Sequence, residues 1–342
     1  MAERLPCGER KNITLVGLAF FVMLGVSVGV QYGANALAVR FAPRLVRSWI
    51  YVWLLSVLPL YLVGLPLCLL VLRPVPTLRA EKHSMTFGQF LIALMMCFGI
   101  MYPLNIFSNI LNLIIGAITG SGQENPIVSA ISSSNPLGTL AFAVILGPVL
   151  EELVFRGLII SRMRRFGDKA AILFSAAIFA LFHGNFFQIF YAFGVGLLFG
   201  FIYARTNRLR YSMGLHVCLN FTGSFIPSLI LSKVDLSQLA SLSFGPGDIP
   251  SILDGTFSFD VSSLLSEDIL WLLAYSAFSQ LILALTVVGI VMLIKNRRRF
   301  VCLPGPVQIP QGAYFRTLFL DPGFLIYLAG ALALIVWNIA EG

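Results

Sequence analysis

PLGTLAFAVILGPVLEELVFRGLIISR, residues 136 to 162, is an apolar run long enough to cross about 30 Å of hydrocarbon as a single helix. It nevertheless contains Glu151, Glu152 and Arg156. A charged side chain at the centre of a membrane helix costs about 2.5–3.5 kcal/mol on the insertion scale, so such residues are retained mainly where they have a function. This run therefore predicts both a membrane fold and a site within it.

The composition of the whole chain indicates a polytopic membrane protein. Hydrophobic residues make up 58% of the 342 residues and charged residues only 11%, whereas soluble domains carry about 25% charged residues. The net charge of +8 comes from Lys and Arg in short connectors, where they act as topology signals and contact anionic lipid headgroups. We therefore expect membrane lipid, and no nucleic acid, as a partner. The five cysteines are scattered singly and predict neither a disulfide framework nor a thiolate metal site.

Apolar runs of spanning length recur along the chain. They predict an all-α, polytopic transmembrane helical bundle of about eight to nine spans. The run at 86–119 is too long for one simple crossing and contains Pro103, so we expect it to kink, to extend beyond the bilayer or to break into a hairpin. The runs lie at 13–36, 49–72, 86–119, 136–162, 168–185, 187–204, 211–232, 268–294 and 317–338.

The distribution of basic residues predicts the orientation of the bundle. The connectors at 162–169, 205–210 and 295–299 are strongly basic, whereas those at 120–135 and 233–267 hold almost no Lys or Arg. The positive-inside rule places the basic connectors in the cytoplasm. With nine spans the N-terminus is cytoplasmic and the C-terminus lies outside. Arg40, Arg44 and Arg47 then fall in an outside connector, against the rule.

The chain shows no internal repeat and no low-complexity tract, so we expect one membrane domain overall. Within it, residues 1–135 supply N-terminal helices and residues 136–232 hold the core with the polar residues. Residues 233–342 add the only sizeable extramembrane loop and the C-terminal helices.

Helical spacing sorts the polar residues of the spans. Glu152 and Arg156 lie at i and i+4, the favourable order for an acid followed by a base, so we expect them to form a structural ion pair. Glu151 points about 100° away from Glu152 and is left to face a cavity. His216 and Asn220 are also at i and i+4 and share one helix face.

A hairpin around Gly167 brings two of these groups to one depth. Glu151 lies 16 residues before Gly167 and His183 lies 16 residues after it, so antiparallel α-helices set them at matching levels. By the same count His216 lies only a few residues after the next cytoplasmic turn, at 205–210, and so does not reach the level of Glu151 and His183. We expect the segment at 187–204 to be short, tilted or kinked so that His216 can join them.

Two chemistries fit two histidines, a carboxylate and an amide in a membrane cavity. A carboxylate and an imidazole can share a water and take its proton, while amide or imidazolium donors stabilise an oxyanion. Equally, Glu151, His183 and His216 form a plausible zinc set with an open position for water. The residues leave a divalent metal such as zinc and a metal-free mechanism both open.

Three ordered motifs resemble a known family. EELVFR at 151–156, FALFH at 179–183 and HVCLN at 216–220 match the patterns EExxxR, FxxxH and HxxxN, each in its own hydrophobic segment. This set resembles the CPBP (Abi) family of intramembrane proteases, which includes the type II CAAX prenyl endopeptidases. The resemblance covers about residues 140–225.

The resemblance implies a role for each motif residue. Glu151 and His183 would activate water, His216 and Asn220 would stabilise the oxyanion, and Glu152 with Arg156 would support them. It implies an intramembrane endopeptidase of metallo- or glutamate-dependent type. Its substrate would be a membrane-associated peptide, such as a prenylated tail or a leader peptide.

Other readings of the sequence remain open. The same polar cluster would serve the proton or substrate relay of a transporter, or remain as a relic in a non-catalytic immunity or scaffold protein. Ser121 in TGSG invites a serine-protease reading, but it sits among turn residues. HExxH is absent from the sequence, which argues against site-2-type zinc proteases. We expect a multi-pass protein of a bacterial plasma membrane.

Overall fold

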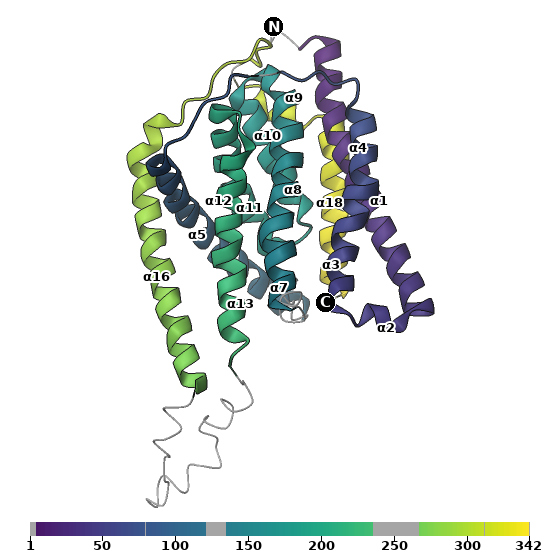
Figure 1. Cartoon of the computed structure of the whole chain (residues 1–342). Coiled ribbons are helices and arrows are strands. Elements are labelled where there is room, and N and C mark those ends of the chain that lie inside the picture. Colours follow the sequence, from purple (N-terminus) through teal and green to yellow (C-terminus); the bar gives the residue numbers. More distant parts are fainter. Residues whose placement is uncertain (1–4, 79, 121–134, 235–266, 311, 342) are drawn as a thin grey trace, which may run out of the picture.

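The computed structural model describes residues 5–78, 80–120, 135–234, 267–310 and 312–341. These residues form a bundle of long helices, and the described part contains no strand (Figure 1). Within these described ranges, eight helices are long and apolar enough to cross a membrane, so the chain is a multi-pass membrane protein. The prediction of an all-α bundle of eight to nine spans is confirmed. Ser121 and most of the loop predicted at 233–267 lie outside the described residues.

The eight spans follow one another along the chain. In order, they are α1 (Cys7–Phe41), α3–η1–α4 (Trp49–Leu72), α5 (Phe87–Thr119), α7–η2–α8–η3–α9–η4 (Pro136–Phe166), α11 (Phe186–Thr206), α12–η5–α13 (Leu209–Leu231), α16–η8 (about 267–299) and α18 (Pro322–Glu341). Two short helices, α2 (Pro43–Val46) and α17 (Tyr314–Phe319), lie in connectors.

The fifth predicted run forms a shorter helix than a span requires. Helix α10 (Asp168–Phe182) has 15 residues, or about 22 Å of helix, which is less than the hydrocarbon thickness. Most of its residues are buried, so it is an internal helix of the bundle. It leads the chain from the end that carries the basic connectors to the turn at residues 183–185, where α11 begins its return (Figure 1).

The long run at 86–119 forms one continuous helix. Thr86 and Gln89 close its N-terminus as a capping box, and Gly120 ends it in a left-handed conformation with φ of 72°. Pro103 lies within the helix without breaking it, so the predicted hairpin is not formed. At about 50 Å the helix is longer than the hydrocarbon layer, and its oblique course in Figure 1 accommodates the excess.

The basic connectors and the N-terminus lie at one end of the bundle, and the C-terminus lies at the other (Figure 1). Side chains tie this basic end together: Arg165 forms an ion pair with Glu9 of α1, and Asp168 accepts hydrogen bonds from Arg164 and from the Leu303 backbone N–H. This is the arrangement expected for nine passages of the chain, with α10 as the short one.

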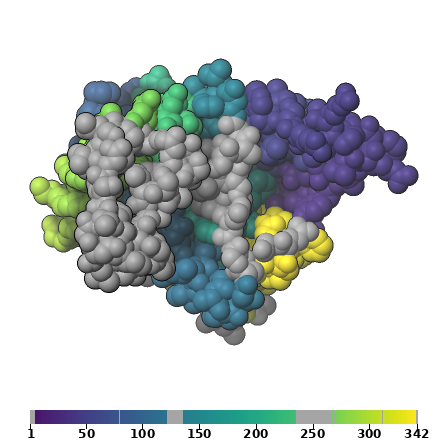
Figure 2. Space-filling view, turned by 90° about the horizontal axis from the view of Figure 1, so that it is seen from below, coloured from purple at the N-terminus to yellow at the C-terminus, as the bar shows by residue number. Residues whose placement is uncertain are grey.

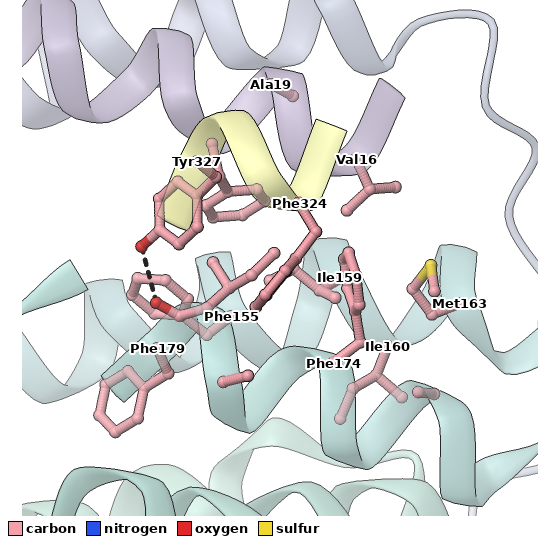
Figure 3. Packing of buried hydrophobic residues seen from close by; sticks show 14 of the residues in the cluster. Val16, Ala19, Phe155, Ile159, Ile160, Met163, Phe174, Phe179, Phe324 and Tyr327 are labelled. Carbon is pink, nitrogen blue, oxygen red and sulfur yellow. Dashed lines mark hydrogen bonds between the residues drawn. The ribbon is translucent and has the colours of Figure 1, made fainter. Parts of the chain in front are cut away.

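Two helix pairs flank the polar helices. On one side α1 and α18 pack against η3 and α10, and Figure 3 shows Val16, Phe324 and Tyr327 meeting Phe155 and Phe174 in this core. Helices α5 and α16 cover the other side of the bundle, with α11 and α12 between them and the centre. Viewed from the end opposite the N-terminus, the N-terminal helices project from one side and α16 lies at the other (Figure 2).

Glycine contacts allow the flanking pairs to pack closely. A Cβ on Gly17 of α1 would lie 2.3 Å from the carbonyl carbon of Gly323, just inside α18. A Cβ on Gly99 of α5 would lie 2.5 Å from the corresponding atom of Gly289 in α16. Small residues at such crossings let backbones approach within the bilayer, where the hydrophobic effect gives no drive for helices to associate.

Candidate active site

The predicted site residues come from three adjacent segments of the bundle. Glu151 ends α8 (Gly147–Glu151), and Glu152 opens η3 (Glu152–Ile160), which also carries Arg156. His183 follows the last residue of α10, and His216 lies on α12 (Leu209–Asn220). The structure thus brings the three motifs together in the centre of the bundle.

The assumption of regular α-helices before Gly167 was wrong. Residues 152–160 form a π-helix, whose i→i+5 hydrogen bonds place more residues in each turn than an α-helix has. The segment between Glu151 and the turn at Gly167 is therefore somewhat shorter than 16 residues of regular α-helix. His216 does reach Glu152, and α11 (Phe186–Thr206) is a continuous helix of 21 residues, so the expected shortening of the segment at 187–204 did not occur.

Glu152 and Arg156 are fully buried and lie in contact with each other. Arg156 Nη1 is 3.0 Å from Glu152 Oε1, and both side chains are 0% exposed. The contact lacks good hydrogen-bond alignment, and the guanidinium finds no hydrogen-bond acceptor among the described residues. Instead, its carbon lies 4.2 Å from the ring centre of Phe179 and 5.3 Å from that of Phe199. Aromatic faces on this scale stabilise a desolvated guanidinium.

Glu152 also binds a histidine, which the sequence did not predict. His216 Nδ1 lies 3.1 Å from Glu152 Oε1. Arg156 favours the ionised form of this carboxyl, and an ionised carboxylate only accepts, so Nδ1 carries the hydrogen. Nε2 is then the nitrogen directed toward Glu151, whose Oε2 lies 3.7 Å away. Glu152 thus fixes the orientation of the imidazole, because the hydrogen bond at one ring nitrogen sets which nitrogen carries the hydrogen and where the other points.

Glu151 differs from its neighbour in exposure and contacts. Its side chain is 29% exposed, whereas that of Glu152 is 0% exposed. The 3.7 Å separation from His216 is longer than a hydrogen bond. Glu151 is therefore the carboxylate of the group that remains accessible to water or a ligand.

His183 has a defined tautomer. Its Nδ1 lies 2.9 Å from the Phe179 carbonyl oxygen, which can only accept, so Nδ1 donates and Nε2 carries the lone pair of the neutral ring. The Phe179 ring separates the two histidines, at 4.8 Å from His183 and 5.9 Å from His216 between ring centres. Glu151 acts electrostatically on His183. Glu151 is thus near both imidazoles, and its Oε2 lies 3.7 Å from Nε2 of His216.

Asn220 is held by the neighbouring π-helix. Its Nδ2 donates to the carbonyl oxygen of Ala143 at 2.9 Å, in η2 (Thr139–Leu146). An amide nitrogen carries two hydrogens, so one N–H of Asn220 remains for another acceptor. The backbone contact fixes the direction in which that N–H points.

Two tyrosines near Glu151 were not found by sequence reasoning. Tyr61 lies on η1 (Pro59–Gly64) and Tyr191 lies on α11, and Glu151 acts electrostatically on both. Each lies in an apolar run, where a tyrosine is a common residue and does not by itself indicate a site. Only the packing of helices distant in sequence places their hydroxyl groups near the carboxylate.

The predicted zinc set does not assemble into a ligand group. Among the described residues, no three His, Cys, Asp or Glu side chains are grouped so that they could hold a metal ion. His216 uses Nδ1 for Glu152, and His183 uses Nδ1 for a backbone carbonyl. Metal-bound histidines make the same Nδ1 contacts while they bind the metal through Nε2, so these contacts fit both kinds of site. What does not match a three-ligand site is the grouping of the described side chains.

Comparisons with known proteins agree with the resemblance drawn from the three motifs. Residues 133–222 match the family described as type II CAAX prenyl endopeptidase Rce1-like. The "Putative membrane peptidase YdiL" of Bacillus subtilis is 28% identical over 163 residues, which cover 47% of this chain and 66% of that protein. The "Membrane-embedded CAAX protease MroQ" of Staphylococcus aureus is 30% identical over 125 residues, which cover 34% of this chain and 50% of that protein. The matches thus span between half and two thirds of these relatives, and no solved structure matches significantly.

Proposed function

We propose that this chain, similar through residues 133–222 to the type II CAAX prenyl endopeptidase Rce1-like family, is an intramembrane endopeptidase. The observation that carries the proposal is the contrast between its adjacent glutamates. Glu152 is 0% exposed and bound to Arg156 and His216, whereas Glu151 is 29% exposed and faces the same histidine beyond hydrogen-bond distance. In this proposal the buried pair of Glu152 and Arg156 supports the site, and the accessible Glu151 carboxylate takes part in the reaction.

In the proposed reaction Glu151 and His183 activate one water. The water donates one hydrogen bond to the lone pair on His183 Nε2, and Glu151 takes the other proton as the water oxygen attacks the peptide carbonyl carbon. The carbonyl π electrons move to oxygen and give a tetrahedral intermediate. Glu151 then passes the proton to the amide nitrogen, and the C–N bond breaks to give a carboxylic acid and an amine.

His216 and Asn220 are suited to hold the negative oxygen of that intermediate. A carboxylate lies beside each ring nitrogen of His216, Glu152 at Nδ1 and Glu151 at Nε2, and in the imidazolium form its Nε2–H would donate to the oxyanion. The second N–H of Asn220, directed by the Ala143 carbonyl, would donate from the same helix. Neither donor needs to reorient during the reaction, which is the condition for effective electrostatic stabilisation.

The substrate we propose is a membrane-associated or lipidated peptide. The site lies within the apolar bundle, and the peptide bond must reach it from the bilayer or its surface. One of the relatives carries a name that describes it as a CAAX protease, which makes peptides with a prenylated or leader-type end the first candidates.

Peptides released by cells test the proposal. Bacteria that make the wild-type chain are expected to release peptide fragments that are missing when the chain carries Glu151→Gln, because the water loses its base. Mass spectrometry of the medium and of the membrane fraction would detect them, with chain abundance matched by immunoblot. Identical peptides from both strains, together with proton-coupled uptake lost in the variant, would favour a transporter instead.

Chelation tests the mechanism separately. We expect purified protein in lipid vesicles to keep its cleavage rate after incubation with EDTA, since no three His, Cys, Asp or Glu side chains of the described residues are grouped to hold a metal ion. EDTA already saturated with zinc serves as the control. A loss of activity with free EDTA alone, restored by added zinc, would contradict the metal-free form of the proposal.

A further inference from the structure

Helix α18 contacts the turn that presents His183, although it lies far outside residues 133–222. The turn consists of His183, Gly184 and Asn185, between the end of α10 and the start of α11. Asn338 of α18 donates from Nδ2 to the carbonyl oxygen of Gly184 at 3.0 Å. A residue at the C-terminal end of the chain thus binds the backbone next to a proposed catalytic histidine.

The turn needs such a partner because helix ends leave carbonyl groups unsatisfied. The His183 carbonyl accepts from Asn185 Nδ2 at 2.7 Å, and Asn185 Oδ1 also accepts from the Gln188 N–H to cap α11. Gly184 is buried, and its carbonyl has Asn338 as the side-chain donor. A buried carbonyl without a partner costs about as much as a lost hydrogen bond.

The conformation of Gly184 adds a second contact with α18. Its φ is +64°, in the left-handed region that favours glycine. A Cβ at this position would lie 2.8 Å from Leu334 Cδ2 and 3.9 Å from Asn338 Nδ2. Leu334 therefore packs directly on the turn while Asn338, one helical turn further along α18, binds its carbonyl.

Asn338 differs from most of its helix in polarity. It is the only Asn or Gln in α18, in a segment composed mainly of Leu, Ala, Ile and Val. It lies at the outer face of the bundle, where an amide without a partner is unfavourable in a membrane segment. The hydrogen bond to the Gly184 carbonyl gives the NH2 group of this amide a partner and directs the side chain inward.

We propose that Asn338 is a positioning residue that sets the orientation of the His183 imidazole through the Gly184 carbonyl. This inference rests on the proposed function, since it assigns a purpose to the orientation of His183. His183 is joined to Gly184 by one peptide bond, and its Nδ1 is anchored on Phe179 one turn earlier. Without this hydrogen bond the Gly184–Asn185 peptide plane is free to rotate, and we expect the turn, and with it His183 Nε2, to shift relative to Glu151.

Kinetics give the first test. Asn338→Leu keeps the branched shape of the side chain and removes the donor, and we expect kcat to fall about 10- to 100-fold, with KM within about twofold, because misplacement of about 1 Å at a reacting group costs this much. Asn338→Gln keeps the amide and should recover part of the rate. If Asn338→Leu does not accumulate, Asn338→Ala replaces it. Wild-type kcat in the donor-less variant would overturn the proposal.

Tyr327→Phe is the matched control. Tyr327 donates its hydroxyl hydrogen to the Ile178 carbonyl at 2.8 Å, so this variant also removes one bond from α18 to the backbone of α10. That bond lies away from the 183–185 turn. We expect Tyr327→Phe to lower thermal stability and to leave kcat unchanged, and an equal fall of kcat in both variants would reduce Asn338 to a structural role.

The imidazole itself gives a test that does not depend on cleavage. The chain has three histidines, so selective ¹⁵N labelling gives few imidazole signals, which single His→Gln variants assign. We expect Asn338→Leu to shift the His183 signals and to leave those of His83 and His216 in place. Unshifted His183 signals would overturn the proposal whether or not the protein proves to be a peptidase, while shifted signals in a protein without peptidase activity would count against the proposed function alone.

Discussion

Glu151→Gln is expected to abolish peptide cleavage, with kcat reduced by at least about 10³-fold, the upper part of the range for loss of a general base. Gln has nearly the same shape as Glu but cannot take a proton from water. The measurement is the rate of cleavage of a substrate peptide by purified variants in lipid vesicles. His183→Ala should be similarly inactive, because the water then loses the acceptor that orients it.

Glu81→Gln is the matched control for this variant. Glu81 is exposed in the connector before α5, so the same change of charge there should leave the rate within about twofold of wild type. Retention of most of the wild-type rate in Glu151→Gln, with the variant folded and abundant, would remove Glu151 from the mechanism. If His183→Ala is active and Glu151→Gln is not, Glu151 remains the base, and His216 rather than His183 accepts the hydrogen bond from the water.

Arg156→Leu is expected to lower the free energy of unfolding by about 3–5 kcal/mol, because it leaves the Glu152 charge buried without its cation. Replacement of both partners, as Glu152→Gln with Arg156→Leu, should recover most of this loss. No unpaired charge then remains, and the amide oxygen of the introduced glutamine can still accept from His216. Unfolding of detergent-solubilised protein, followed by circular dichroism, measures both differences from the wild-type chain.

Arg205→Leu is the control for the stability series, because Arg205 is exposed at the end of α11. It should change the free energy of unfolding by about 0.5 kcal/mol or less. If the double variant is as unstable as Arg156→Leu, the cost lies in the lost stacking on Phe179 and Phe199 rather than in the unpaired carboxylate. That outcome would replace the ion-pair explanation with one based on packing.

The pattern of apolar runs was enough to predict the helices, because a membrane span must satisfy its backbone hydrogen bonds within itself. The predicted runs at 49–72 and 86–119 correspond closely to Trp49–Leu72 and Phe87–Thr119. The run at 168–185 extended three residues beyond its helix, because it included the turn residues His183, Gly184 and Asn185. The polar residues of this turn mark the helix end, as they do at the membrane surface.

The candidate site was predictable in its residues and less so in its contacts. The i,i+4 spacing of Glu152 and Arg156 placed them on one face of a helix, and the structure has them 3.0 Å apart. No local spacing relates Glu152 to His216, which lies 64 residues further along the chain. The π-helix at 152–160, which alters their relative depth, has no signature in the apolar pattern.

The sequence by itself determined that the chain is a helical membrane protein and which few polar residues its spans contain, because hydropathy and helical periodicity depend only on local order. Helical spacing suggested that Glu152 is paired and that Glu151 faces a cavity, whereas the tertiary structure decided how far each carboxylate is buried and which distant groups meet the histidines. Glu152 and Glu151 are adjacent and chemically identical, and only the packing of α12, η1 and α11 around them makes their surroundings different. The contact of Asn338 with the His183 turn joins residues 154 positions apart, and such a contact depends on how helices associate in space rather than on any pattern within one helix.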